Sequence, residues 1–518
     1  KIELFCVVNM GVSAYICWMF VRQKINRSGS VSVQIVQKVG RINKVVRTIG
    51  CSTDPVEIEK LVGQAHYEKE RIHGPTLFDP RPVEDLKNVT NDCIRVIGPD
   101  LVFSELYSRI GFDAIKEPLL RSLAISRLTH PGSKLKLSEY LNITGRDSIS
   151  VYSIYRFLDK ISDRYKTQIE HLSFAYTKRV LGGEISIVFY DMTTIYFESS
   201  QPDELRIPGF SKEGKHHLPQ IFLGLLVGCN GYPIGYDIFE GNIYEGHTLI
   251  PILERFEKQF SIGHPIVVAD AGLLSKGNIG ELTKRGYKFI LGARVKNEGS
   301  AIAEIVEGRK WANGDMVEYL RPDGSRLIIE YTESRAKKDG FNRTRGIRKL
   351  EKQVSKGKLT KSNLNNRGYN KYLRLDGDLT ISIDYQKYDN DSKWDGIKGY
   401  ITNTDLSNDL VVTRYRDLWQ IERAFRISKT DLQIRPVYHR RRDRIESHIC
   451  ISFMAYLMYK ELERLLMGSN LGTSVEKAIE QVNKIYEIII PGDDGSHSTF
   501  RPHNNPIQQK IIEIISSS

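Results

Sequence analysis

The chain contains 518 residues, of which 40% are hydrophobic and 27% are charged. These proportions exclude a fibrous or intrinsically disordered protein, and the length exceeds one compact core, so about three or four modules are expected. Lys and Arg outnumber Asp and Glu by 75 to 63, which leaves a net charge of +12. This excess favours a polyanionic partner, because fixed positive charge displaces counterions from phosphates. The cysteines are scattered without a C-x-x-C pair, which argues against a zinc finger or a disulfide framework.

The N-terminal end of the sequence is apolar over Leu4–Phe20. This segment is marginal in length for a transmembrane helix, Asn9 and Gly11 weaken it, and no small-residue cleavage site of a signal peptide follows. We therefore expect Met19 to be the true start and residues 1–18 to be a spurious extension translated from upstream sequence.

Residues 19–54 show a strand pattern. Val31, Val33 and Ile35 alternate with polar residues, and Gly40 supplies a turn before a second apolar group. The pattern predicts a small module built on a β-hairpin.

Residues 55–180 show helical periodicity instead. Basic side chains, among them Arg127 and Lys134, gather near a break at Pro131 and Gly132. A helical region of this kind suits DNA binding. A plain helical scaffold explains the pattern equally well, because no recognition-helix signature stands out.

Two apolar runs within residues 183–295 end in aspartates. Ile185–Tyr190 is followed by Asp191, and Pro265–Ala269 is followed by Asp270. Such runs are typical of strands buried on both faces, and further strand and helix patterns lie between and after them. Their order predicts an α/β fold in which helices pack on a mixed sheet.

Residues 296–400 interrupt this order and are expected to form a β-rich insertion. Its basic segment, Arg335–Lys361, holds eleven Lys or Arg and two acidic residues. Such a run is usually a solvated loop or helix, and in a DNA enzyme it becomes a candidate backbone contact. The sheet domain is expected to resume over 401–470, with a helix from about Asn408 to Lys429, before a C-terminal tail over 471–518.

The two aspartates, Asp191 and Asp270, are expected to lie close together. In an α/β sheet the carboxyl ends of neighbouring strands open into one crevice. A single aspartate there could cap a turn, with Thr193 and Thr194 in that turn. Two carboxylates repel each other unless a cation lies between them, so the pair indicates a metal site.

Glu422 is the third acidic candidate. Tyr415 and Lys429 lie seven residues before and after it, which is about two helical turns, so the three side chains are expected on one helix face. Arg426 follows Glu422 by four and could form an ion pair with it, which is the alternative explanation of this glutamate.

Two further groups carry less specific signals. His216 and His217 could bind phosphate or metal, but no partner ligands stand at a recognisable spacing, so a surface loop is favoured. Glu245 follows the third strand of the sheet and is an unproven candidate for the metal site.

Residues 415–429, Y-R-D-L-W-Q-I-E-R-A-F-R-I-S-K, resemble the Y-R-E-K signature of bacterial insertion-sequence transposases of the DDE class (insertion-sequence-four type). That signature is Tyr, two residues, Arg, three residues, Glu, six residues, Lys. Tyr415, Glu422 and Lys429 match it in type and spacing. Its Arg falls on Leu418, which is a departure.

The family's other two catalytic segments have counterparts as well. V-F-Y-D-M-T-T-I-Y-F-E resembles the first at Asp191, and V-V-A-D-A-G-L-L-S resembles the second at Asp270. The long gap between Asp270 and Glu422 matches the family branch with a β-rich insertion. The resemblance extends from about Met19 to Leu466.

The resemblance implies a ribonuclease-H-like sheet in which Asp191, Asp270 and Glu422 hold two Mg²⁺ ions, with Mn²⁺ as an equally suitable metal. Two such ions can activate a water or a 3′-hydroxyl on one side of a phosphodiester and stabilise the leaving oxygen on the other. One site can therefore cleave the ends of an insertion sequence and join them to target DNA.

The expected partner is double-stranded DNA, both the terminal inverted repeats of the element and the target, bound by a homodimer and without a membrane. The expected location is the bacterial cytoplasm, in association with the nucleoid. The arginines that follow residue 434 form either a DNA-backbone contact or a solvated basic face. The candidate DNA-binding residues are Tyr415, Arg416, Trp419, Lys429, Arg435, Arg440, Arg441 and Arg442.

Three alternatives stay open. A metal-dependent nuclease without strand transfer would use the same carboxylates. A DNA-binding derivative that has lost catalysis is a second alternative, because Leu418 stands in the signature's Arg position. A glycosidase with paired carboxylates is the most distant, since it explains neither the basic runs nor Lys429.

Overall fold

The computed structural model of the chain divides into two compact units. One contains Lys1–Ile94 and Ile488–Phe500, and the other contains Arg95–Glu487 and Arg501–Ser518. The predicted extension, residues 1–18, lies outside the described residues except for Trp18 and stays a prediction. The described residues are 18–39, 42–72, 90, 93–144, 149–198, 201–210, 214–260, 262–273, 275–357, 359–365, 368–376, 380–491 and 497–517.

The smaller unit is built on an antiparallel sheet of β1 (Trp18–Ile25), β2 (Val31–Val39) and β3 (Ile42–Ser52). Helix α1 (Pro55–Ile72) packs on this sheet. Val33, Ile35 and Ala65 are buried in its core, because alternate side chains of β2 point to the same face. In the same unit, residues 488–491 of β16 (Tyr486–Pro491) pair with β17 (His497–Phe500).

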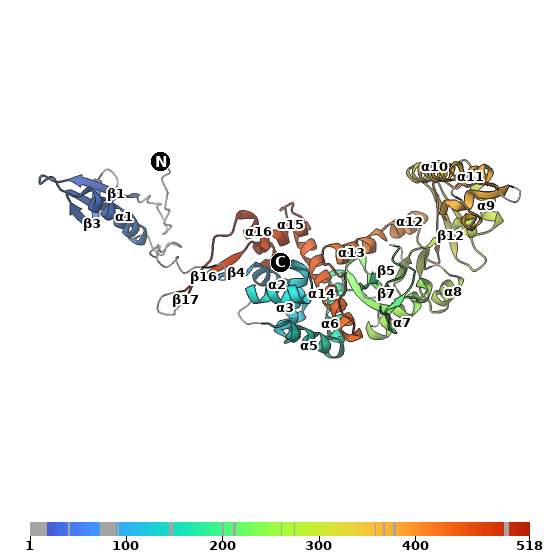
Figure 1. Cartoon of the computed structure of the whole chain (residues 1–518), viewed down its shortest axis with the longest axis horizontal. Helices are drawn as coiled ribbons and strands as arrows, with labels where there is room; N and C mark the ends of the chain where they lie inside the picture. Colours follow the sequence, from blue (N-terminus) through green and yellow to red (C-terminus); the bar gives the residue numbers. More distant parts are fainter. Residues whose placement is uncertain are drawn as a thin grey trace. The chain divides into compact units, whose positions relative to one another are not determined.

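A long helix, α14 (Arg442–Met467), is the centre of the helical part of the larger unit (Figure 1). Nearly all of its side chains are buried, because other helices pack around it. None of the described helices is both long and apolar enough to cross a membrane. The elements that surround or extend this helical part are β4 (Ile94–Val96), α2 (Gly98–Ile110), α3 (Pro118–Thr129), α4 (Lys134–Thr144), α5 (Val151–Lys160), α6 (Lys166–Val180), α15 (Val475–Val482) and α16 (Pro506–Ser516).

The larger unit also contains the mixed sheet that the sequence predicts. Its strand order is β11–β12–β15–β10–β9–β5–β7–β6, and β8 also pairs with β7. Strands β5, β9 and β10 run parallel, and the other pairings are antiparallel. The strands are β5 (Ile187–Tyr196), β6 (Ile207–Pro208), β7 (Pro219–Val227), β8 (Pro233–Glu240), β9 (Ile266–Ala269), β10 (Phe289–Ala293), β11 (Met316–Leu320), β12 (Arg326–Tyr331) and β15 (Ile397–Thr402).

Helices cover both faces of this sheet (Figure 1). On one face α7 (Leu249–Phe260), α8 (Lys276–Lys284) and α9 (Ser300–Glu307) share a core with Val188 and Tyr190. On the other face α12 (Asn408–Arg416) and α13 (Trp419–Thr430) share a core with Phe189 and Val268. Because side chains alternate along a strand, the residue after Tyr190 points toward α12 and α13.

The insertion over residues 296–400 contains strands where they are expected and helices as well. β11 and β12 join the main sheet beside β15, whereas the basic run forms a helix, α10 (Glu333–Ser355). This run is helical because Lys, Arg and Glu have high helix propensity, and Ile347, Leu350 and Val354 form an apolar stripe at helical spacing. The stripe packs with β13 (Leu373–Asp376), β14 (Thr380–Ile383) and α11 (Tyr385–Ser392).

A substitution of Gly235 on β8 would test how tightly the sheet packs on α7. A Cβ atom at this position would overlap the ring of Phe256. We expect Gly235→Ala to lower the free energy of unfolding by about 1–3 kcal/mol, measured by denaturant titration. The control is Gly280→Ala at an exposed position of α8, where a Cβ meets nothing within 4 Å and alanine favours the helix. Equal stability of the two variants would contradict this packing.

Candidate active site

Asp191 and Asp270 lie side by side on neighbouring strands. β5 and β9 run parallel in a register that pairs Tyr190 with Ala269, so the next residue of each chain segment is an aspartate. Neighbouring strands are about 4.8 Å apart, and paired residues point to the same face. Both carboxylates therefore project from the face that α12 and α13 cover.

Asp191 lies within a strand, and its predicted place at the end of one is wrong. The pairing of β5 with β9 stops at Tyr190, but its antiparallel pairing with β7 continues to Tyr196. Thr193 and Thr194 pair with residues of β7, so they are not part of a turn that the aspartate could cap. Asp191 thus stands where one neighbouring strand ends and the other continues.

The backbone holds both carboxylates. The amide of Met192 donates to Asp191 Oδ1 at 2.7 Å, and the amide of Gly272 donates to Asp270 Oδ1 at 2.6 Å. Glu245, left unproven by its sequence position, approaches the same place. A Cβ atom on Gly272 would stand 2.9 Å from Asp270 Oδ1 and 3.3 Å from Glu245 Oε2. Two carboxylates therefore converge beside a residue that leaves room for them.

Glu422 lies in the first turn of α13, on a helix that is shorter than predicted. The single helix expected from Asn408 to Lys429 is interrupted at Asp417 and Leu418, so that prediction is wrong. The amides of residues 418, 420 and 421 bond to carbonyls three residues back, which tightens the chain into a turn. Tyr415 and Glu422 therefore belong to different helices.

The alternative explanation of Glu422 finds no support. No ion pair joins it to Arg426 in the described part of the chain, and Glu422 is exposed. Its helix packs on β5 and β7, while α12 packs on β9, β10 and β15. The two helices thus bring Glu422 and Tyr415 to the sheet face that carries the aspartates.

Tyr415 is buried next to the carboxylates. Its hydroxyl lies against Gly292, the residue of β10 that follows the pairing of Leu291 with Ala269, and it would overlap a Cβ there. Burial raises the pKa of Tyr415, and the charge of Asp270, followed by those of Asp191 and Glu422, adds to the increase. All three predicted carboxylates therefore raise the pKa of this one hydroxyl.

One cation of the insertion, Lys398, also reaches this region, although it is not among the predicted site residues. The Lys398 ammonium lies 4.4 Å from the ring centre of Tyr415. Burial lowers the pKa of Lys398, Arg335 and Arg416 lower it further, and Glu330 and Glu422 oppose the decrease. In the sequence, Lys398 looks like any other lysine next to a buried strand residue. Its position beside Tyr415 is therefore apparent only from the fold.

The predicted DNA-binding residues have different surroundings. Arg416 forms an ion pair with Glu330, a buried residue of β12 that also accepts the hydroxyl of Tyr400 at 2.7 Å. Leu418, in the signature's Arg position, is buried in the core. The guanidinium of Arg416 is therefore already paired with Glu330. It does not offer a free cation in place of the signature's Arg, which is Leu418 in this chain.

The remaining candidates surround α13 and the start of α14. Lys429 is half-buried, and the guanidinium of Arg435 lies 5.3 Å from the ring centre of Tyr196. The other three arginines are exposed: Arg441 pairs with Asp443, Arg442 pairs with Glu446, and Arg440 precedes them. His216 and His217 are exposed, as expected of a surface loop.

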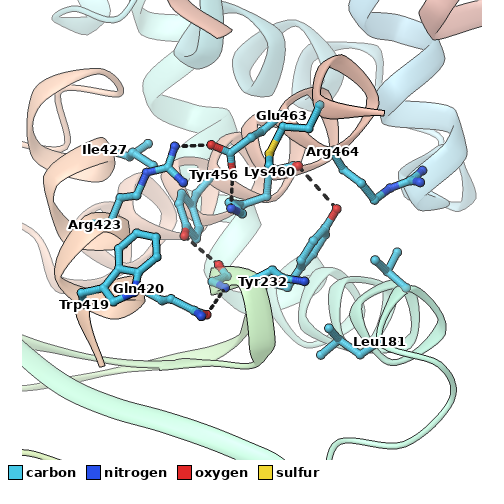
Figure 2. Close-up of a pocket in the computed structure, with 14 residues that line it drawn as sticks. Leu181, Tyr232, Trp419, Gln420, Arg423, Ile427, Tyr456, Lys460, Glu463 and Arg464 are labelled. Carbon is cyan, nitrogen blue, oxygen red and sulfur yellow. Dashed lines mark hydrogen bonds and ion pairs between the residues drawn. The ribbon is translucent and has the colours of Figure 1, made fainter. Parts of the chain in front are cut away.

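Trp419 is exposed and lines a cavity of about 430 Å³ between α13 and α14 (Figure 2). Within this cavity Arg423 and Lys460 both pair with Glu463. The cations on its wall are therefore matched by a carboxylate of the chain itself.

The carboxylates approach one another without forming a closed ligand set. Within the described ranges, no three His, Cys, Asp or Glu side chains are arranged to hold a metal ion together. Oxygens of Asp270 and Glu245 both lie near Gly272, and Asp191 lies on the strand next to Asp270. Oxygen is the donor that Mg²⁺ and Mn²⁺ prefer.

A family model described as the transposase DDE domain matches residues 182–458, which is more than half of the chain. The chain belongs to this family. The matched part of the DDE domain contains all three predicted carboxylates, Asp191, Asp270 and Glu422, together with Tyr415 and Lys429.

Two solved structures are similar to this DDE-domain protein. A piggyBac transposase synaptic complex with hairpin DNA has a TM-score of 0.39 and 8% identity, over 74% of this chain and 76% of that one. A Mos1 mariner paired end complex with Mn has a TM-score of 0.15 and 12% identity, over 44% of this chain and 67% of that one. No curated protein matches the chain in sequence.

Arg416 offers a test of structural against DNA-contacting roles. We expect Arg416→Ala to lower the free energy of unfolding by about 1 kcal/mol, since it leaves buried Glu330 without its cation while Arg416 itself is exposed. Adding Glu330→Gln should recover most of the loss, as measured by denaturant titration in a double-mutant cycle. Unchanged stability combined with weaker DNA binding would show that Arg416 contacts DNA instead.

Proposed function

We propose that the chain is a DNA transposase that cleaves the ends of an insertion sequence and joins them to target DNA. The observation that carries this proposal is the register of β5 and β9, which sets Asp191 beside Asp270 on the face covered by the helix of Glu422. The match to the transposase DDE domain spans all three residues. The core β8–β7–β5–β9–β10 is proposed to be ribonuclease-H-like.

Divalent metal ions are proposed to bind these carboxylates. Asp191 and Asp270 are close enough to repel each other, and an oxygen of Glu245, in the 3-10 helix Glu245–His247, approaches Asp270. An all-oxygen donor set of this kind fits two Mg²⁺ or Mn²⁺ ions. When bound, the ions would activate a water or a 3′-hydroxyl and stabilise the leaving oxygen of a phosphodiester.

Glu422 is proposed to complete the ligand set when metal and DNA bind. It is exposed in the first turn of α13, without an ion pair to Arg426 in the described part of the chain. Its negative charge raises the pKa of both Lys398 and Tyr415. Movement of this side chain toward the aspartates would leave α13 packed on β5.

Tyr415 and Lys398 are proposed to position the phosphate that reacts. The hydroxyl of Tyr415 lies beside Gly292 at the end of the strand next to Asp270, and the ammonium of Lys398 lies over its ring. A hydrogen-bond donor and a cation at this place can orient a phosphodiester without taking part in bond making. Lys429 is proposed to contact DNA farther along α13.

The partners are proposed to be the terminal inverted repeats of the element and the target DNA. Because one active site cuts one end at a time, joining both ends at one target requires two copies of the chain, which supports a homodimer on DNA. Location in the bacterial cytoplasm, in association with the nucleoid, follows from this activity and is part of the proposal.

The experiment incubates the protein with DNA carrying the element's ends and with supercoiled plasmid, in Mg²⁺, Mn²⁺ or EDTA. We expect metal-dependent cleavage at the ends and joining into the plasmid. Asp270→Asn and Glu422→Gln should each lower both rates by more than about a hundredfold, the larger end of what even an outer-sphere partner of a metal contributes. Glu204→Gln, which removes an exposed carboxylate of the same domain, is the matched control.

Three other outcomes would redirect the proposal. Cleavage without joining would favour a nuclease that performs no strand transfer. Tight, salt-sensitive binding to the ends with no cleavage in either metal would favour a DNA-binding derivative. Full activity of Asp270→Asn would contradict the site itself.

A further inference from the structure

A second cavity, of about 450 Å³, lies between the start of α4 and the segment that joins α13 to α14. Arg127 from α3 and Lys134 from α4 line it on one side, and Arg435, His439 and His448 line it on the other. No carboxylate is among the described residues on its wall. The basic side chains on its wall therefore face no acidic side chain among the described lining residues.

Two of these cations are buried. Arg127 is 4% exposed and Lys134 is 5% exposed. Arg127 donates to the carbonyls of Leu432 and Gln433 and to His448 Nδ1, all of them uncharged. Among the residues that the structure describes, none forms a hydrogen bond or an ion pair with the ammonium of Lys134. A buried ammonium without a partner is costly, because it loses its hydration and gains nothing in return.

The histidines do not supply the missing negative charge. His448 Nε2 lies 2.9 Å from the carbonyl of Ile434, which fixes the proton on Nε2 and leaves Nδ1 to accept from Arg127. Burial, followed by the charge of Lys134, lowers the pKa of His439 to about 3, and burial with Arg127 lowers that of His448 well below its ordinary value. Asp159 is the nearby acid that opposes the decrease at His439, and it is engaged by Arg444.

The cavity beside Trp419 provides a comparison. There, Arg423 and Lys460 share Glu463, so the chain neutralises its own cations. Around Lys134 the chain provides cations without an acid, and burial beside Arg127 lowers the pKa of Lys134 well below its ordinary value. An anion from outside the chain would remove this cost.

Helix α4 adds to the positive field. It begins at Lys134, so its N-terminal amides and the positive end of its dipole lie at the cavity. Ser133 caps the helix, accepting from the amide of Lys136 at 3.3 Å. A tetrahedral anion with several acceptor oxygens matches such a combination of amides, guanidinium and ammonium.

We propose that this cavity binds a phosphate of the DNA backbone. The proposal rests on the proposed function, and it adds Arg127 and Lys134 to the predicted DNA-binding residues, of which Arg435 also lines the cavity. The cavity adjoins the end of β5, because the guanidinium of Arg435 lies over the ring of Tyr196, the last residue of β5, and Val437 pairs with Phe197, the residue after it. Tyr196 follows Asp191 by five positions of extended strand, which is about 17 Å. A DNA strand that runs from the active site along β5 would place one of its phosphates at this cavity within a few nucleotides.

The test measures binding of the full chain to a short DNA duplex of mixed sequence, in EDTA and at several salt concentrations. Because a phosphate contact is independent of sequence and of catalysis, failure of cleavage would not affect this result. We expect Lys134→Met to weaken binding roughly tenfold or more and to reduce the slope of log K against log salt by about one. Lys477→Met, on exposed α15, is the charge-matched control and should change neither quantity by as much.

Stability separates this role from a structural one. Since Lys134 is an unpaired buried cation, Lys134→Met should keep or raise the melting temperature, so weaker binding could not be attributed to misfolding. A lower melting temperature with an unchanged salt slope would overturn the proposal. A second result would also overturn it. If inorganic phosphate stabilises the native chain but not Lys134→Met, while both bind DNA equally, the cavity binds free phosphate and not DNA.

Discussion

The repulsion between two carboxylates on adjacent strands is the constraint on which the candidate site depends. The register of β5 and β9 sets Asp191 beside Asp270, about one strand spacing apart. At that separation two full charges repel by on the order of 3 kcal/mol when the effective dielectric constant is about 20. Hydrogen bonds from the amides of Met192 and Gly272 offset part of this cost, and they also fix the oxygens in place. The arrangement becomes favourable when a cation lies between the oxygens.

The surrounding elements can be understood as supports for that pair. Gly272 and Gly292 leave space at the ends of two parallel chain segments, which Glu245 and Tyr415 occupy. The insertion also contributes to the site. Its strands extend the main sheet, and the charge of Arg335 lowers the pKa of Tyr415. Glu330 of the inserted β12 holds both Arg416 and Tyr400. A segment that interrupts the domain in sequence thus forms one wall of the site in space.

The sequence predicted those features that depend on local pattern. Apolar runs located β5 and β9, and the acid that follows each run located both aspartates. Features set by pairing between distant segments could not be predicted: β5 extends past Asp191 only because β7 pairs with it. The predicted helix from Asn408 to Lys429 breaks because Leu418 is drawn into the core, an effect that periodicity does not register. Lys398 carries no local signal, and the sequence marks Lys134 only as one of several basic residues near Pro131. The burial of Lys134 could not be predicted, because it is set by tertiary contacts.

The central claim, that Asp191 and Asp270 share a divalent metal ion, is tested most directly by anomalous diffraction from crystals grown with Mn²⁺. The account predicts an anomalous peak between these carboxylates, bonded to oxygens of both, and its loss in Asp270→Asn. Mn²⁺ bound elsewhere on the chain, with the two aspartates bonded only to protein groups, would contradict it.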